Sequence, residues 1–109
     1  MKKILFFTVA FCLIAATAFG ASTIKIGLMA PLTGPWASEG QDMKQIVELL
    51  AAELNAQGGL LGKKVEIISA DDGGDPKTAA LAAQKLVTQD VVGAIGTYGS
   101  SITEASQNI

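Results

Sequence analysis

Apolar and polar positions follow one another along the chain in blocks that predict strands and helices in turn. Short apolar runs at residues 24–29, 65–70 and 91–95 predict three strands. Longer segments with apolar residues at helical spacing separate these runs, at residues 41–56 and from residue 76 onward. The third run is apolar almost throughout, which is typical of a strand covered on both faces.

The first predicted helix has one apolar face and recognisable ends. The members of that face are Met43, Ile46, Val47, Leu50 and Leu54. Ser38 and Gln41 stand three residues apart, which fits a capping box at the start of the helix. Gly58 and Gly59 predict its end, because glycine tolerates the left-handed backbone of a helix C-terminus.

Two further helices have start signals of their own. Asp75 followed by Pro76 predicts an N-cap and a first helical residue, and this helix should run to about Thr88. Ser101 and Glu104 again have the spacing of a capping box, which predicts a third helix near the end of the chain.

The element order β-α-β-α-β-α predicts an α/β fold. We expect a three-layer open parallel sheet, because strands that alternate with helices make right-handed parallel crossovers. For a flavodoxin-like arrangement, the strand order is 2-1-3. Three strands bury little apolar surface. We therefore expect residues 21–109 to form an incomplete N-terminal lobe of a longer ligand-binding domain.

Residues 1–20 have the pattern of a secretory signal peptide. Lys2 and Lys3 precede an apolar stretch, and small residues near Gly20 suit a signal peptidase. The only cysteine, Cys12, lies inside this leader. The alternative is an uncleaved anchor, but the apolar stretch is short for a membrane span. After cleavage we expect a periplasmic protein that is not itself embedded in the membrane.

Composition and motifs argue against several functions. The net charge is −2 and the sequence contains no arginine, so it lacks the clustered Lys and Arg residues of a nucleic-acid binder. No catalytic residues and no cofactor are indicated, because no glycine-rich nucleotide fingerprint follows the first strand. Asp71 and Asp72 follow the second strand and have the chemistry to bind a metal or a ribose. Such a pair more often just ends a strand in water, so no metal site is predicted.

The candidate site lies in the loops after the first and third strands. In an open parallel sheet, ligands bind beyond the carboxyl ends of the strands, where the strand order reverses. With order 2-1-3, that point lies between residues 30–40 and 96–101. These loops hold Trp36 and Tyr98, the only aromatic residues after the leader. The alternative is that Trp36 covers a helix end and Tyr98 covers a sheet edge.

The hydroxyl-rich segment around Tyr98 offers groups for a carboxylate. Thr97 and Ser100 bring hydroxyls, and the N–H groups of Gly99 to Ser101 stand at the start of the third helix. The same residues are equally typical of an ordinary strand-to-helix turn. The sequence alone leaves both interpretations open.

Four blocks together resemble the N-terminal part of branched-chain amino acid-binding proteins, the periplasmic receptors of ABC transporters. These blocks read IKIGLMAPLTGPWASEG, LNAQGGLLGKKVEI, DDGGDPKTAALAAQKLV and VVGAIGTYGSS. The resemblance implies a type I periplasmic-binding fold of two lobes, with ligand trapped between them. It implies that Ser100 helps hold the ligand's α-carboxylate and that Tyr98 lines the same cleft. Glu39 stands where such proteins often have an aromatic residue. This departure from the family's pattern allows a polar or amine-bearing solute.

The resemblance favours a non-enzymatic receptor for a branched-chain amino acid or a related small amino acid or amide. Its other partner would be the membrane permease of an ABC importer. The main alternative is a ligand-sensing module of a chemoreceptor or signalling protein with the same fold. An exported nucleotide- or sugar-processing enzyme is a third and weaker hypothesis, because the glycine fingerprint and histidine are missing.

Overall fold

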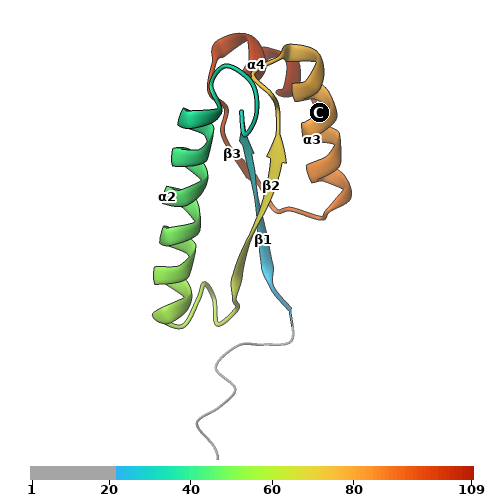
Figure 1. Ribbon diagram of the computed structural model, residues 1–109. Coiled ribbons are helices and arrows are strands. Elements are labelled where there is room, and N and C mark those ends of the chain that lie inside the picture. The colour runs from blue at the N-terminus through green and yellow to red at the C-terminus, as the bar shows by residue number, and fades with distance from the viewer. Residues whose placement is uncertain (1–21) are drawn as a thin grey trace, which may run out of the picture.

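The computed structural model describes residues 22–109, which form a sheet with helices on both of its faces (Figure 1). The predicted signal peptide lies outside the described residues. The elements are β1 (Ile24–Ala30), α2 (Ala37–Ala56), β2 (Val65–Asp71), α3 (Pro76–Thr88), β3 (Ala94–Ile95) and α4 (Ser100–Ser106). Helix α2 covers one face of the sheet, and α3 and α4 lie on the other. Within residues 22–109, no helix combines the length and apolar character needed to cross a membrane.

The sheet is parallel and has the order β2-β1-β3, so the predicted fold class and strand order are confirmed. Strand β1 pairs with β2 from Ile24↔Val65 to Ala30↔Asp71 and with β3 at Leu28↔Ile95. The second half of β1 is buried, as expected for a central strand. The main core cluster joins it to β2, α3 and α4 through Met29, Ala70, Ala79, Ala82, Leu86 and Ile102.

Helix α2 begins earlier than predicted, and the capping box at its start is wrong. Its N-cap is Trp36, which makes no side-chain capping bond, and Ser38 lies inside the first turn. The predicted end is confirmed: Gly58 N–H donates to the Asn55 carbonyl (3.1 Å) and Gly59 N–H to the Leu54 carbonyl (2.9 Å).

The apolar face of α2 is only partly buried. Met43, Val47 and Leu54 are half-buried against the sheet, whereas Ile46 and Leu50 remain 58% and 59% exposed. Helix α2 packs on β1 and β2, so the far side of its apolar face has nothing to cover it within the described residues. The sequence shows which face of α2 is apolar. It does not show how much of that face the sheet covers.

A polar clamp fixes the last turn of α2 to β2. The amide of Asn55 donates to the Val65 carbonyl (2.8 Å), and its oxygen accepts from the Val65 N–H (2.7 Å). Both backbone groups of the first β2 residue are thereby satisfied at the point where the strand begins.

Helix α3 agrees with its prediction at both ends. The Asp75 carboxylate accepts a hydrogen bond from the Thr78 N–H (3.0 Å), and Pro76 is the first helical residue. The bonds from Thr78, through its N–H and then its hydroxyl, lower the pKa of Asp75. Ala79, Ala82 and Leu86 are buried on the sheet side of α3.

Strand β3 is shorter and more exposed than predicted. It covers only Ala94–Ile95, and both residues are exposed. Backbone pairing with β1 extends a little further, since the Val92 N–H donates to the Lys25 carbonyl (2.9 Å). However, Val92 is 74% exposed. The prediction of a strand covered on both faces is wrong, because the helices that flank the sheet pack on β1 and β2 and leave β3 exposed.

The second predicted capping box is also wrong. Helix α4 starts at Ser100 with Gly99 as its N-cap and no side-chain capping bond, so Ser101 already lies in the first turn. Ile102 is buried and anchors this seven-residue helix to the core.

Candidate ligand-binding site

Three connecting segments meet at the carboxyl edge of the sheet: residues 31–36 after β1, residues 72–75 after β2 and residues 96–99 after β3 (Figure 1). Parallel strands place all their carboxyl ends on one edge, so loops that are far apart in sequence become neighbours there. This edge is where the sequence predicted the site.

Asp71, the last residue of β2, holds the loop that follows β1. One carboxylate oxygen accepts from the N–H groups of Leu32 (2.8 Å), Thr33 (3.2 Å) and Gly73 (2.8 Å). The other oxygen accepts from the Thr33 hydroxyl (2.6 Å). Burial acts to raise the pKa of Asp71, but these hydrogen bonds outweigh it and the pKa is lowered.

Asp72 has the opposite environment. It is fully buried, and one carboxylate oxygen accepts only the Gly74 N–H (2.8 Å). The other oxygen has no hydrogen-bond partner among residues 22–109. Burial raises the pKa of Asp72, and the charge on Asp71 adds to this, while the bond from Gly74 offsets only part. The two carboxylates therefore act within the fold, and the described residues hold no cluster of three or more metal-ligating side chains.

The structure brings Trp36 and Tyr98 together across the edge. Their ring centroids are 5.7 Å apart and the ring planes meet at 65°, an edge-to-face arrangement. The rings are part of the surface, with exposures of 39% and 40%. The two loops predicted to flank the site do meet, 62 positions apart in sequence by residue number.

Gly74 supports this aromatic pair from the β2–α3 turn. A Cβ placed on Gly74 would lie 2.7 Å from Trp36 Cε3, so the indole ring rests where a side chain would stand. Gly74 also has a φ of +69°, which disfavours other residues. Trp36 therefore contacts the loops that follow both β2 and β3, which the sequence analysis did not foresee.

The hydroxyl groups near Tyr98 divide into engaged and free ones. Thr97 Oγ1 lies 2.6 Å from Thr103 Oγ1 and 3.2 Å from the Gly99 carbonyl oxygen, so it is used within the loop. Ser100 and Ser101 are exposed at the start of α4. Their hydroxyls form no hydrogen bond with any other part of residues 22–109, and both are available to a ligand.

Glu39 is the third residue of α2, three positions after Trp36. It is exposed, and in the described part of the chain its carboxylate takes part in no ion pair or hydrogen bond. Gly96 follows β3 and packs closely on β1. A Cβ there would clash with the Met29 carbonyl oxygen, so the missing side chain allows β3 to pack on β1.

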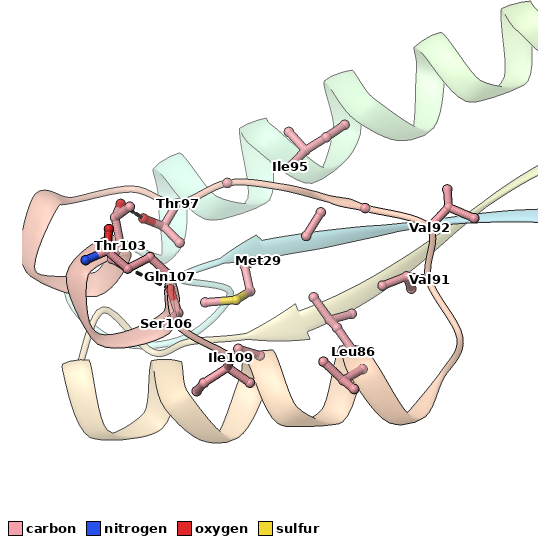
Figure 2. A pocket seen from close by; sticks show the side chains of 15 residues that line it. Met29, Leu86, Val91, Val92, Ile95, Thr97, Thr103, Ser106, Gln107 and Ile109 are labelled. Atoms are coloured by element: carbon pink, nitrogen blue, oxygen red, sulfur yellow. Dashed lines mark hydrogen bonds between the residues drawn. The ribbon is translucent and has the colours of Figure 1, made fainter.

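Sequence reasoning missed an apolar groove on the other side of β3. Figure 2 shows it between β3, α3 and α4, with Met29 and Leu86 at its base and Ile109 beside them. Its volume is about 360 Å³. Trp36, Tyr98 and Ser100 do not line it, so it is separate from the aromatic edge. The groove exists because β3 presents an uncovered edge, a feature that the strand's sequence does not reveal.

The comparison with known families decides where this chain belongs. The family described as "Periplasmic binding protein" matches residues 23–109. The chain belongs to this family. Periplasmic binding proteins are substrate-binding proteins and not enzymes, and solved members have the same three-stranded parallel arrangement as part of a type I periplasmic-binding fold.

Individual periplasmic binding proteins give the same picture. The chain is 38% identical to a Leu/Ile/Val-binding protein homolog 2 of Brucella abortus, over 100% of this chain and 30% of that protein. It is similar to the branched-chain amino acid transporter substrate-binding protein LivJ of Streptococcus pneumoniae, solved with isoleucine, at 34% identity and a TM-score of 0.74. That match covers 78% of this chain and 25% of LivJ.

A further structural relative has a different ligand class in its name. The fatty acid ABC transporter substrate-binding protein of Thermomonospora curvata matches at 30% identity and a TM-score of 0.75, over 84% of this chain and 23% of that one. The chain thus spans less than a third of the length of each of these relatives.

Proposed function

We propose that this chain is part of an extracytoplasmic receptor that delivers a branched-chain amino acid, or a related small amino acid or amide, to an ABC importer. The observation that carries the proposal is the meeting of Trp36 and Tyr98 at the carboxyl edge, with the free hydroxyl of Ser100 two residues further on. Membership of the periplasmic binding protein family supports it, as does the isoleucine bound to the Streptococcus pneumoniae relative.

In this proposal the carboxyl edge forms one wall of the site. The Ser100 hydroxyl and the N–H groups of Gly99 to Ser101 donate to the ligand's α-carboxylate, while Tyr98 and Trp36 surround its side chain. A second lobe closes over the ligand, and the closed form docks on the membrane permease. Hinge closure around a ligand is a recognised response of periplasmic binding proteins.

The proposal places the protein in the periplasm. Residues 1–20 act as a cleaved signal peptide, and residues 21–109 form part of the N-terminal lobe. The length of the Brucella abortus relative supports the second part of this proposal, since the chain corresponds to 30% of that protein.

Calorimetric titration of the full polypeptide that the gene encodes tests this function. We expect saturable binding of L-leucine, L-isoleucine, L-valine or a related small amino acid or amide. The Ser100→Ala change should weaken binding by roughly 1–3 kcal/mol, because a hydrogen bond to a buried carboxylate is lost. Ser38→Ala is the matched control, since it removes an exposed hydroxyl from the first turn of α2 that the proposal does not use. Absence of binding to every amino acid and amide tested would contradict the function, and unchanged affinity in Ser100→Ala would remove Ser100 from the site.

A further inference from the structure

We propose that Trp36, Tyr98 and Glu39 form a subsite for an ammonium group carried on the ligand's side chain. The group is a protonated primary amine or a quaternary ammonium, and each of these carries one positive charge. This inference rests on the proposed receptor function. Within that function it favours an amino acid with a cationic side chain over the branched-chain amino acids.

The aromatic pair has the geometry of a corner rather than a flat wall. The two rings meet at 65° with centroids 5.7 Å apart, and each keeps about two fifths of its surface exposed. The face of an aromatic ring carries the negative part of its quadrupole and attracts a cation placed over it. A small cation in such a corner contacts both Trp36 and Tyr98 at once.

The corner is held in place by the loop beneath it. Trp36 rests on Gly74, where a Cβ would come within 2.7 Å of its ring. The Gly74 N–H in turn donates to the buried carboxylate of Asp72 (2.8 Å). A ring positioned before the ligand arrives loses little conformational entropy on binding, which favours affinity.

Glu39 supplies a negative charge on the same side of α2. Trp36 is the N-cap and Glu39 the third helical residue, and side chains at these two positions lie over the same turn. Helical side chains also lean toward the N-terminus, which here is the carboxyl edge of the sheet. The exposed carboxylate is unpaired within residues 22–109, so it is available to a ligand cation.

The charges around the edge favour a cation as well. Asp71 ends β2 at this edge, and Asp72, Asp75 and Glu39 lie in its loops or first helical turns. Lys77 is the one lysine in a first turn there among the described residues. Asp71 and Asp75 already accept several hydrogen bonds, and Asp72 is buried, so Glu39 is the group left to face a ligand. An excess of one sign of charge raises the local concentration of ligands with the opposite charge.

An aliphatic side chain would also find apolar contact in this corner. It would, however, place an unpaired carboxylate next to apolar surface as the cleft closes, and burying a charge without a partner is costly. Glu39 is therefore the residue that separates a cationic from an aliphatic ligand.

Calorimetry on the full polypeptide with L-lysine, Nε-trimethyl-L-lysine and L-norleucine tests the inference. L-norleucine has the same four-carbon side chain as lysine but lacks the terminal ammonium group. We expect L-lysine or its trimethyl derivative to bind about tenfold more tightly than L-norleucine. Trp36→Leu should lower the affinity for the cationic ligand about tenfold and change the affinity for L-norleucine little. Trp36→Phe should retain most of the affinity for the cationic ligand.

Glu39→Gln should weaken cation binding by about threefold and reduce its dependence on salt. Glu53→Gln, which removes a charge from the exposed far end of α2, is the matched control. If Trp36→Leu fails to fold, Tyr98→Leu tests the corner from the other loop.

Three results would overturn the subsite. The first is that L-norleucine binds as tightly as both cations. The second is that Trp36→Leu and Tyr98→Leu lower the affinity for every ligand equally. The third is that Glu39→Gln changes cation binding no more than Glu53→Gln does. Binding of neutral but not cationic amino acids overturns the subsite and leaves the proposed receptor function intact. Failure of every amino acid and amide to bind overturns both.

Discussion

Asp71 and Asp72 are adjacent residues whose carboxylates differ in hydrogen bonding and burial. Asp71 accepts bonds from Leu32, Thr33 and Gly73, and so ties the loops after β1 and β2 together. Asp72 is fully buried and accepts a single bond, from Gly74. The hydrogen bonds stabilise the charged form of Asp71, whereas burial destabilises the charged form of Asp72.

We predict that stability responds to pH in opposite ways at these two residues. The pKa of Asp71 is lowered in the folded protein, so its contribution is present above the unfolded value of 3.8 and is lost as pH falls through the folded pKa. The pKa of Asp72 is raised, so its contribution is most favourable below 3.8 and is lost as pH rises through the folded pKa.

This difference is measured by urea unfolding of the full polypeptide between pH 3 and pH 7. The free energy of unfolding is compared among the wild type, Asp71→Asn and Asp72→Asn. At pH 7, Asp71→Asn should cost about 1–3 kcal/mol through lost charged hydrogen bonds, and this loss should shrink toward pH 3. Asp72→Asn should be as stable as the wild type or more stable at pH 7, and should lose that advantage at pH 3. If the stabilities of the two variants relative to the wild type changed with pH in the same direction, the opposite pKa shifts of Asp71 and Asp72 would be contradicted.

At the scale of elements, local signals predicted the start of one helix correctly and the starts of two others wrongly. Asp75 and Pro76 begin α3 as expected, because an N-cap bond and a fixed φ act within one turn. Both predicted capping boxes are wrong, since α2 and α4 each start before the serine that was expected to cap them. Strand β3 was recognised as apolar, but its exposure depends on neighbouring elements and not on its own sequence.

The β2–α3 turn offers a test of how one element positions another. Gly74→Ala should displace Trp36, because its Cβ would lie 2.7 Å from the ring and φ is +69°. Left-handed backbone costs a non-glycine residue about 1–2 kcal/mol, and the clash adds to this. We expect lower thermal stability and weaker ligand binding in the full polypeptide.

Gly73→Ala is the matched control for this change. Gly73 also has a positive φ (+59°), but a Cβ there has no atom nearer than 3.9 Å. Both variants carry backbone strain, and only Gly74→Ala meets the indole ring. Equal losses of ligand affinity in the two variants would show that Trp36 does not depend on Gly74 for its position.

At the scale of the whole molecule, connectivity predicted the candidate edge better than side-chain patterns did. Alternating strands and helices led to a parallel sheet in the order 2-1-3, and that order brings Trp36 and Tyr98 together. The role of Asp71 was not predictable, because its partners Leu32 and Thr33 lie 39 and 38 residues away. The groove beyond β3 was missed for the same reason: it is formed by three elements, none of which signals it alone.

The uncovered edge of β3 predicts how residues 22–109 behave when expressed alone. Val92 and Ile95 are 74% and 46% exposed beside unpaired strand backbone, and such an edge can pair with another chain. We expect this segment to associate at micromolar concentrations in size-exclusion chromatography with light scattering. Val92→Lys should raise the monomer fraction, because a charged side chain on an edge strand opposes strand pairing.

Leu61→Lys separates edge pairing from general hydrophobic association. Leu61 is 87% exposed in the α2–β2 connection, away from the β3 edge, so the change adds the same charge and removes a comparable apolar surface. If the edge drives association, Val92→Lys restores monomers and Leu61→Lys has little effect. Equal effects would point to exposed apolar surface in general, and a monomeric wild-type segment with a cooperative thermal transition would show that the open edge does not pair.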